Sequence, residues 1–205
     1  MSEKGRNYKF SQILKPVLGM LVAVIINLLA NKIAVSTGLP LYLDSIGTLL
    51  AAAMGGYLPG ILVGYVTNVV TMVNNMENVY YASIGALIAV ACTFFAKKGF
   101  FNKLWKSILT VPCFAVIGGI GGSILTYLMY GFGVGEGISA PFTRRLLEQG
   151  VFDVFTAQLT SDFVIDLVDK AICVFVLYSA LKIIPDKIKK SFSLTGWQQR
   201  PFTKE

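Results

Sequence analysis

Charged residues gather in an apolar segment near the C-terminal end of the chain. Asp162, Asp166, Asp169 and Lys170 all lie in the first half of SDFVIDLVDKAICVFVLYSAL (161–181). A charge at the centre of a bilayer costs roughly 2.5–3.5 kcal/mol, whereas each Leu, Ile, Phe or Val returns only about 0.3–0.6 kcal/mol. These residues must therefore be shallow, paired, or turned towards water or protein. Ionisable residues inside a membrane are candidates for function by default.

The spacing of these residues indicates partial compensation of their charge. The three aspartates follow i, i+4, i+7 spacing on one helix face, and Asp166 and Lys170 form an acid-to-base pair at i, i+4. Such pairs could be purely structural and fix the packing between helices. They could also line a ligand pocket.

Polar residues recur at the same expected depth in other apolar segments. They are Asn27, Asn31, Lys32, Asp44, Ser45, Thr48, Thr67, Asn68, Thr71, Asn74, Tyr80, Tyr81 and Ser83. The other halves of these segments are apolar or small, which predicts a polar cavity open on one side only. A channel would need polar lining through both leaflets. The predicted substrate-binding residues are Asn27, Lys32, Asp44, Asn68, Thr71, Tyr80, Asp166, Asp169 and Lys170.

The balance of charge favours a pocket over a purely structural network. Asp44, Asp166 and Asp169 stand against Lys32 and Lys170, whereas a structural network is expected to balance. A net acidic pocket with aromatic residues suits a compact, partly cationic heterocycle.

Composition identifies the class of protein. Of 205 residues, 55% are hydrophobic and only 14% charged, with a mean hydropathy of +0.66, against about 25% charged in soluble domains. We therefore expect an integral membrane protein. Histidine is absent, and the three cysteines lack metal-ligand spacing, so we predict no metal, no cofactor and no enzyme activity. A membrane aspartyl protease would need a G-x-G-D motif, which the sequence lacks.

Apolar runs long enough to cross a bilayer predict an all-α fold. We expect one domain over residues 1–205 with six transmembrane helices near 12–35, 40–56, 58–74, 79–96, 107–131 and 162–184. The glycines and proline of MGGYLPG predict a tight turn between the second and third. The segment 132–161 is expected to be an extracellular loop, with a short helix over 141–149, and a candidate lid.

The positions of the basic residues predict the orientation. Fourteen of the eighteen lie before the first helix, between the fourth and fifth, or after the sixth. They are Lys4, Arg6, Lys9, Lys15, Lys97, Lys98, Lys103, Lys106, Lys182, Lys187, Lys189, Lys190, Arg200 and Lys204. Under the positive-inside rule both termini are cytoplasmic, in a multi-pass protein of the cell membrane with its ligand cavity facing outward. The net charge of +7 then reflects topology, and no nucleic-acid partner is predicted.

Two of these stretches carry a family resemblance. LPLYLDSIGTLLAAAMGGYLPGILVGYVTN (39–68) and DLVDKAICVFVLYSALKIIP (166–185), with six helices in about 200 residues, resemble the substrate-binding S components of energy-coupling factor (ECF) transporters. The resemblance implies capture of a small vitamin or vitamin precursor outside the cell. It also implies docking on a transmembrane coupling protein driven by two ATPase subunits, with no ATP site in this chain.

The docking feature that the resemblance implies is an A-x-x-x-A pattern in the first helix. The literal match, Ala30 to Ala34, contains a lysine and lies at the outer end, so Gly19 and Ala23 in the cytoplasmic half are the better candidates. Small residues four apart let helices approach closely. Ordinary packing within the chain is the alternative for this pair. Close packing and a flexible point are both open for the glycines of VIGGIGGS (116–123).

Two other functional classes stay open. A stand-alone secondary transporter often carries internal repeats and broken helices, and neither is clear here. Similar segments also resemble the membrane input domains of some bacterial sensor kinases, which would make the chain a sensory module for a small molecule.

Overall fold

The fold was obtained as a computed structural model, which describes residues 3–73 and 76–191. Among the predicted residues, Asn74, Arg200 and Lys204 lie outside the described ones. Every regular element within the described ranges is a helix, as the sequence predicts.

The helices follow one another with short connections. Their bounds are α1 Glu3–Ser36, α2 Ile46–Gly55, α3 Tyr57–Thr71, α4 Asn78–Lys97, η1 Phe100–Asn102, α5 Leu104–Ile108, α6 Val111–Ala115, η2 Val116–Ile120, α7 Gly121–Met129, α8 Ala140–Glu148, α9 Val154–Ile183 and α10 Asp186–Ser191. The segment η1 is a 3₁₀ turn, and η2 is one turn of π-helix.

Three helical stretches of the described residues are long and apolar enough to cross a membrane: Ile13–Ser36, Asn78–Lys97 and Leu104–Met129. Helices α2 and α3 are apolar but shorter. Much of the α1 surface is apolar and exposed, for example Leu18, Leu21 and Ile25. Exposing such a surface to water would be unfavourable, so these helices indicate a lipid environment.

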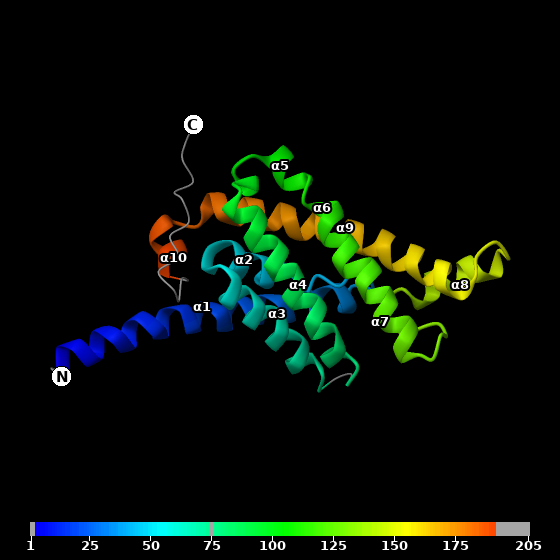
Figure 1. Cartoon of the computed structure of the whole chain (residues 1–205), viewed down its shortest axis with the longest axis horizontal. Helices are drawn as coiled ribbons and strands as arrows, with labels where there is room; N and C mark the ends of the chain where they lie inside the picture. The colour runs from blue at the N-terminus through cyan, green and yellow to red at the C-terminus, as the bar shows by residue number, and fades with distance from the viewer. Residues whose placement is uncertain (1–2, 74–75, 192–205) are drawn as a thin grey trace.

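Helices α1 and α9 extend along the long axis of the molecule, with α2 between them (Figure 1). Helix α2 is buried along its whole length. Helices α3 and α4 form the closest helix pair, and α5 to α7 run along α9 (Figure 1). The main apolar core lies between these layers and includes Leu49, Phe101, Phe114 and Leu177.

Two glycine features explain how the helices approach. Gly56 has φ 88° between α2 and α3, a conformation that glycine adopts without a steric penalty; this confirms the turn predicted from MGGYLPG. Where α3 crosses α4, a Cβ on Gly64 would lie 2.7 Å from the carbonyl oxygen of Gly85. Only small residues allow this crossing.

Several predicted helix limits differ from the structure. The first helix begins at Glu3 and not near 12, the second at Ile46 and not near 40, and the sixth at Val154 and not near 162. The predicted fifth helix, 107–131, contains the π-helical turn η2. Helix α8 confirms the short helix predicted over 141–149, whereas the loop predicted to continue to residue 161 ends where α9 begins. The carboxylate of Asp153 accepts a hydrogen bond from Thr156 N (2.9 Å) and caps α9.

Candidate functional site

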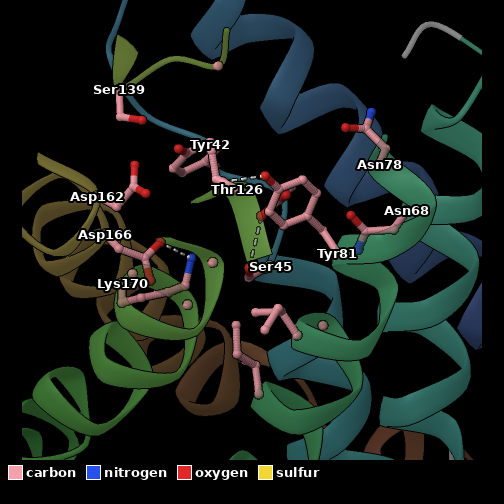
Figure 2. A pocket seen from close by; sticks show the side chains of 18 of the residues that line it. Tyr42, Ser45, Asn68, Asn78, Tyr81, Thr126, Ser139, Asp162, Asp166 and Lys170 are labelled. Atoms are coloured by element: carbon pink, nitrogen blue, oxygen red, sulfur yellow. Dashed lines mark hydrogen bonds and ion pairs between the residues drawn. The ribbon is translucent and has the colours of Figure 1, made fainter. Parts of the chain in front are cut away.

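A cavity of about 180 Å³ lies between α2, α3, α4, the η2–α7 segment and α9. Its wall mixes carboxylates, amides, hydroxyls, glycines and two isoleucines. Figure 2 shows Asp162, Asp166 and Lys170 on one side and Asn68, Asn78 and Tyr81 on the other. A concave site with a few convergent polar groups is the usual form of a small-molecule site.

Four of the nine predicted substrate-binding residues line this cavity. They are Asp44, Asn68, Asp166 and Lys170. The three different parts of the chain that carry them are far apart in sequence. The structure thus brings together the groups whose shared depth was inferred from the hydropathy pattern.

Asp169 has a structural role instead. Its Oδ1 accepts hydrogen bonds from the backbone N–H groups of Tyr42 (3.0 Å) and Leu43 (2.7 Å). Asn31 Nδ2 donates to the carbonyl oxygen of Tyr42 (2.8 Å). Residues 40–45 are not helical, and Leu43 has φ 48°. Non-helical backbone at membrane depth is tolerated only where protein groups satisfy it, and Asp169 and Asn31 do so here.

Lys170 joins two carboxylates. Its Nζ lies 2.9 Å from Asp166 Oδ1 and 2.7 Å from Asp169 Oδ2. All three side chains are nearly completely buried. One ammonium cannot neutralise two carboxylates, so the cluster has a formal excess of negative charge.

Asp162, a neighbour one turn away, is held in a separate network. Its Oδ2 accepts hydrogen bonds from Ser123 Oγ and Gln158 Nε2, each at 2.8 Å. Gln158 Nε2 also donates to Ser139 Oγ (3.1 Å). This network ties the connection before α8 to α7 and α9, and it fixes one wall of the cavity.

The structure does not bring Lys32, Thr71 and Tyr80 into the cavity. Lys32 lies on the exposed face of α1, since it is rotated by about 100° from Asn31, which is half-buried. Thr71 donates to the carbonyl oxygen of Asn68 (3.0 Å). Tyr80 is 57% exposed, whereas the adjacent Tyr81 lines the cavity.

Asn27 also lies outside the cavity wall. It is fully buried and joins three helices, because its amide contacts α2 and α3 from α1. Nδ2 donates to Thr48 Oγ1 (3.0 Å) and Thr67 Oγ1 (2.9 Å), and Oδ1 accepts from Gly47 N (2.6 Å). Its predicted role in substrate binding is replaced by one in packing.

Several cavity residues were not among the nine predicted substrate-binding residues, although Tyr81 was placed at the same depth. Tyr81 shares a hydrogen bond of 2.5 Å with Thr126 Oγ1, and Tyr130 donates one to Glu77. Burial and the bond to Glu77 raise the pKa of Tyr130 to about 12, so the phenol stays a donor at neutral pH. Tyr81 belongs to the polar residues at the expected depth, and Glu77 stands shortly before them; Tyr130 follows an apolar run and had no such signal.

Two of the glycines of VIGGIGGS, Gly118 and Gly119, serve close packing. A Cβ on Gly118 would overlap Asp166 Oδ2, and one on Gly119 would lie 2.7 Å from the Cα of Phe163. Gly122 faces open space although it also lines the cavity. The π-helical turn η2 lies at this contact with α9, and such turns are frequent at functional sites.

This difference gives a matched pair of variants. We expect Gly118→Ala to lower the free energy of unfolding by about 1–3 kcal/mol relative to Gly122→Ala, because its methyl group displaces a buried carboxylate. The helix propensity gained from alanine is the same in both. Thermal unfolding in detergent micelles measures the difference. Equal midpoints for the two variants would contradict the close contact between Gly118 and Asp166.

Of the two predicted docking residues on α1, Gly19 and Ala23, only Gly19 has a partly exposed surface. Ala23 is 2% exposed and packs within the chain, since a Cβ on Gly47 would overlap its carbonyl oxygen. Ala23 therefore packs within the chain and offers little surface to a partner helix. Gly19, one turn earlier, is partly exposed and stays a candidate.

No protein-family model, curated protein or solved structure matches this chain.

Proposed function

We propose that the chain is a membrane-embedded capture protein for a small molecule and acts as the S component of an ECF transporter. The observation that carries the proposal is the polar cavity bounded by buried Asp162, Asp166 and Lys170 in an otherwise apolar helical protein. Burying charges is costly. The fold uses Asp169 to hold the backbone of residues 42 and 43, whereas Asp162, Asp166 and Lys170 line the cavity.

The proposed topology has six crossings with both termini cytoplasmic. The crossings are α1, α2 with residues 39–45, α3, α4, the α5–α7 segment and α9. Helix α2 has ten residues, about 15 Å of helix, so the non-helical backbone held by Asp169 and Asn31 would complete its crossing. The cavity would then open outward, on the side opposite Lys97, Lys98 and Lys182.

In this proposal the chain binds the substrate, and its partners supply the energy for import. A cavity of this size that opens on one side suits a vitamin-like molecule or precursor, which the protein would hold until a partner drives release. The energy would come from a transmembrane coupling protein and two ATPase subunits. Among the residues with an exposed or partly exposed surface, Gly19 and the apolar face of α1 are available for that contact.

The proposal predicts a compound that co-elutes with the protein. The full chain is purified from cells grown in rich medium, and native mass spectrometry identifies what it carries. We expect one small molecule at near-stoichiometric amounts, and its loss in a Gly122→Leu control that fills the cavity from an open position. The identified compound is then used in uptake assays.

Uptake of that compound separates the candidate functions. We expect proteoliposomes with the chain alone to show no sustained uptake, and uptake to need ATP and a co-reconstituted ECF coupling complex. Sustained uptake by the chain alone under an ion gradient would instead indicate a secondary transporter. Binding with no uptake in either arrangement would indicate a sensory module.

A further inference from the structure

The cavity wall carries an excess of acidic groups. Four carboxylic side chains line it, and one lysine does. The acidic residues are Asp44, Glu77, Asp162 and Asp166, and the basic one is Lys170. Lys170 is moreover shared with Asp169, which lies behind the wall. Lys32, counted as a partner from the sequence, is exposed on α1, so the cavity is more acidic than the sequence predicts.

Most of these carboxylates have donors within the protein. Ser45 Oγ donates to Asp44 Oδ1 (2.9 Å), Tyr130 donates to Glu77, and Asp162 Oδ2 has the two donors described above. Among the described residues Asp166 has a donor at one oxygen only, since its Oδ1 accepts from Lys170 Nζ (2.9 Å). Within the described ranges its Oδ2 has no hydrogen-bond partner, although the residue is only 4% exposed.

The position of this oxygen, which we call the cavity oxygen, points to a ligand. It lies against Gly118, and both Asp166 and Gly118 line the cavity. A buried acceptor without a donor is costly, and an N–H group of a bound molecule would supply the donor. A charged N–H group would also balance the acidic wall, and charge-assisted hydrogen bonds are roughly twice as strong as neutral ones.

Aromatic and apolar groups face the acidic side. Tyr81 is held by its hydrogen bond to Thr126, and Ile84 and Ile88 lie on the same helix and line the cavity. Figure 2 shows Tyr81 across the cavity from Asp166. A fixed aromatic ring opposite a carboxylate suits a flat molecule with a cationic end, since the flat body can stack on the ring while the cationic end donates to the carboxylate.

We propose that the cavity binds a small organic cation, with an ammonium or amidinium group donating to the cavity oxygen of Asp166 and a flat apolar body against Tyr81. This inference rests on the proposed function and names the chemical class of its substrate. A bare metal ion is disfavoured, because no group of three His, Cys, Asp or Glu side chains among the described residues could hold one. The acidic wall would reject anionic compounds of the same shape.

The test uses three flat probes that differ in charge: benzamidine, benzamide and benzoate. The full chain is purified in detergent and titrated with each by ligand-observed nuclear magnetic resonance. We expect benzamidine to bind with a Kd on the order of 1 mM, as its size allows. Benzamide should bind at least about tenfold more weakly than benzamidine, and benzoate should show no binding.

Two matched variants test whether the cationic group binds at Asp166. Asp166→Asn should reduce benzamidine binding to the level of benzamide, about tenfold. Glu148→Gln removes the same charge at an exposed position on α8 and should leave binding unchanged. Asp162→Asn is a second cavity variant, expected to weaken benzamidine by a smaller factor, and it serves if Asp166→Asn does not elute as a folded protein.

The inference is overturned if benzamidine does not bind, if benzamide or benzoate binds as tightly, or if both cavity variants bind benzamidine like the unmodified chain. None of these measurements involves uptake or a partner. A capture protein for a neutral or anionic compound would fail this test and still carry a co-eluting ligand, so the two proposals fail separately.

Discussion

Lys170→Met is expected to destabilise the protein by about 3–5 kcal/mol, because it leaves the buried carboxylates of Asp166 and Asp169 without their shared cation. Methionine has nearly the same length, so the change removes charge with little loss of volume. The midpoint of thermal unfolding in detergent micelles measures the effect. Lys182→Met is the matched control on the same helix, since Lys182 is exposed and contacts the carbonyl oxygen of Asn102 (3.2 Å); its effect should stay within about 0.5 kcal/mol.

A second change should restore part of this loss. Adding Asp166→Asn to Lys170→Met removes one of the two stranded carboxylates. Asp169 remains charged but keeps the N–H groups of Tyr42 and Leu43, so we expect partial recovery. If the Lys170→Met and Lys182→Met variants have the same midpoint of thermal unfolding, the cluster of Asp166, Asp169 and Lys170 does not stabilise the fold.

Asn27→Ala is expected to cost about 3 kcal/mol, roughly 1 kcal/mol for each of three buried hydrogen bonds. The bond from Gly47 N counts among these because it satisfies one of the first N–H groups of α2. The comparison is Asn31→Ala, one turn further along the same helix, where a single bond to the Tyr42 carbonyl is lost. We expect about 1 kcal/mol there, measured in the same unfolding assay. A smaller loss at Asn27 than at Asn31 would show that the three-helix contact is not held by this amide.

Local patterns predicted the helical class and part of the site. Apolar runs predict helices because backbone polar groups cannot be left unpaired in lipid, and the turn at Gly56 follows from residues that break helices. The cluster at Asp166 and Lys170 was visible because charges are rare in such runs. The start of α9 was missed although Asp153 carries a capping signal, since the extracellular loop was expected to continue to residue 161.

What the sequence by itself determined is therefore where the polar residues stand along each apolar helix, because that follows from their spacing in the chain. Only the tertiary structure decided which way each side chain faces, because rotation about a helix axis depends on neighbouring helices. Tyr81 lines the cavity and Tyr80 does not, although they are adjacent. Asp169 is used by the backbone of residues 42 and 43, while Asp166, on the same face, lines the cavity. That division depends on contacts between segments more than a hundred residues apart, which no local pattern encodes.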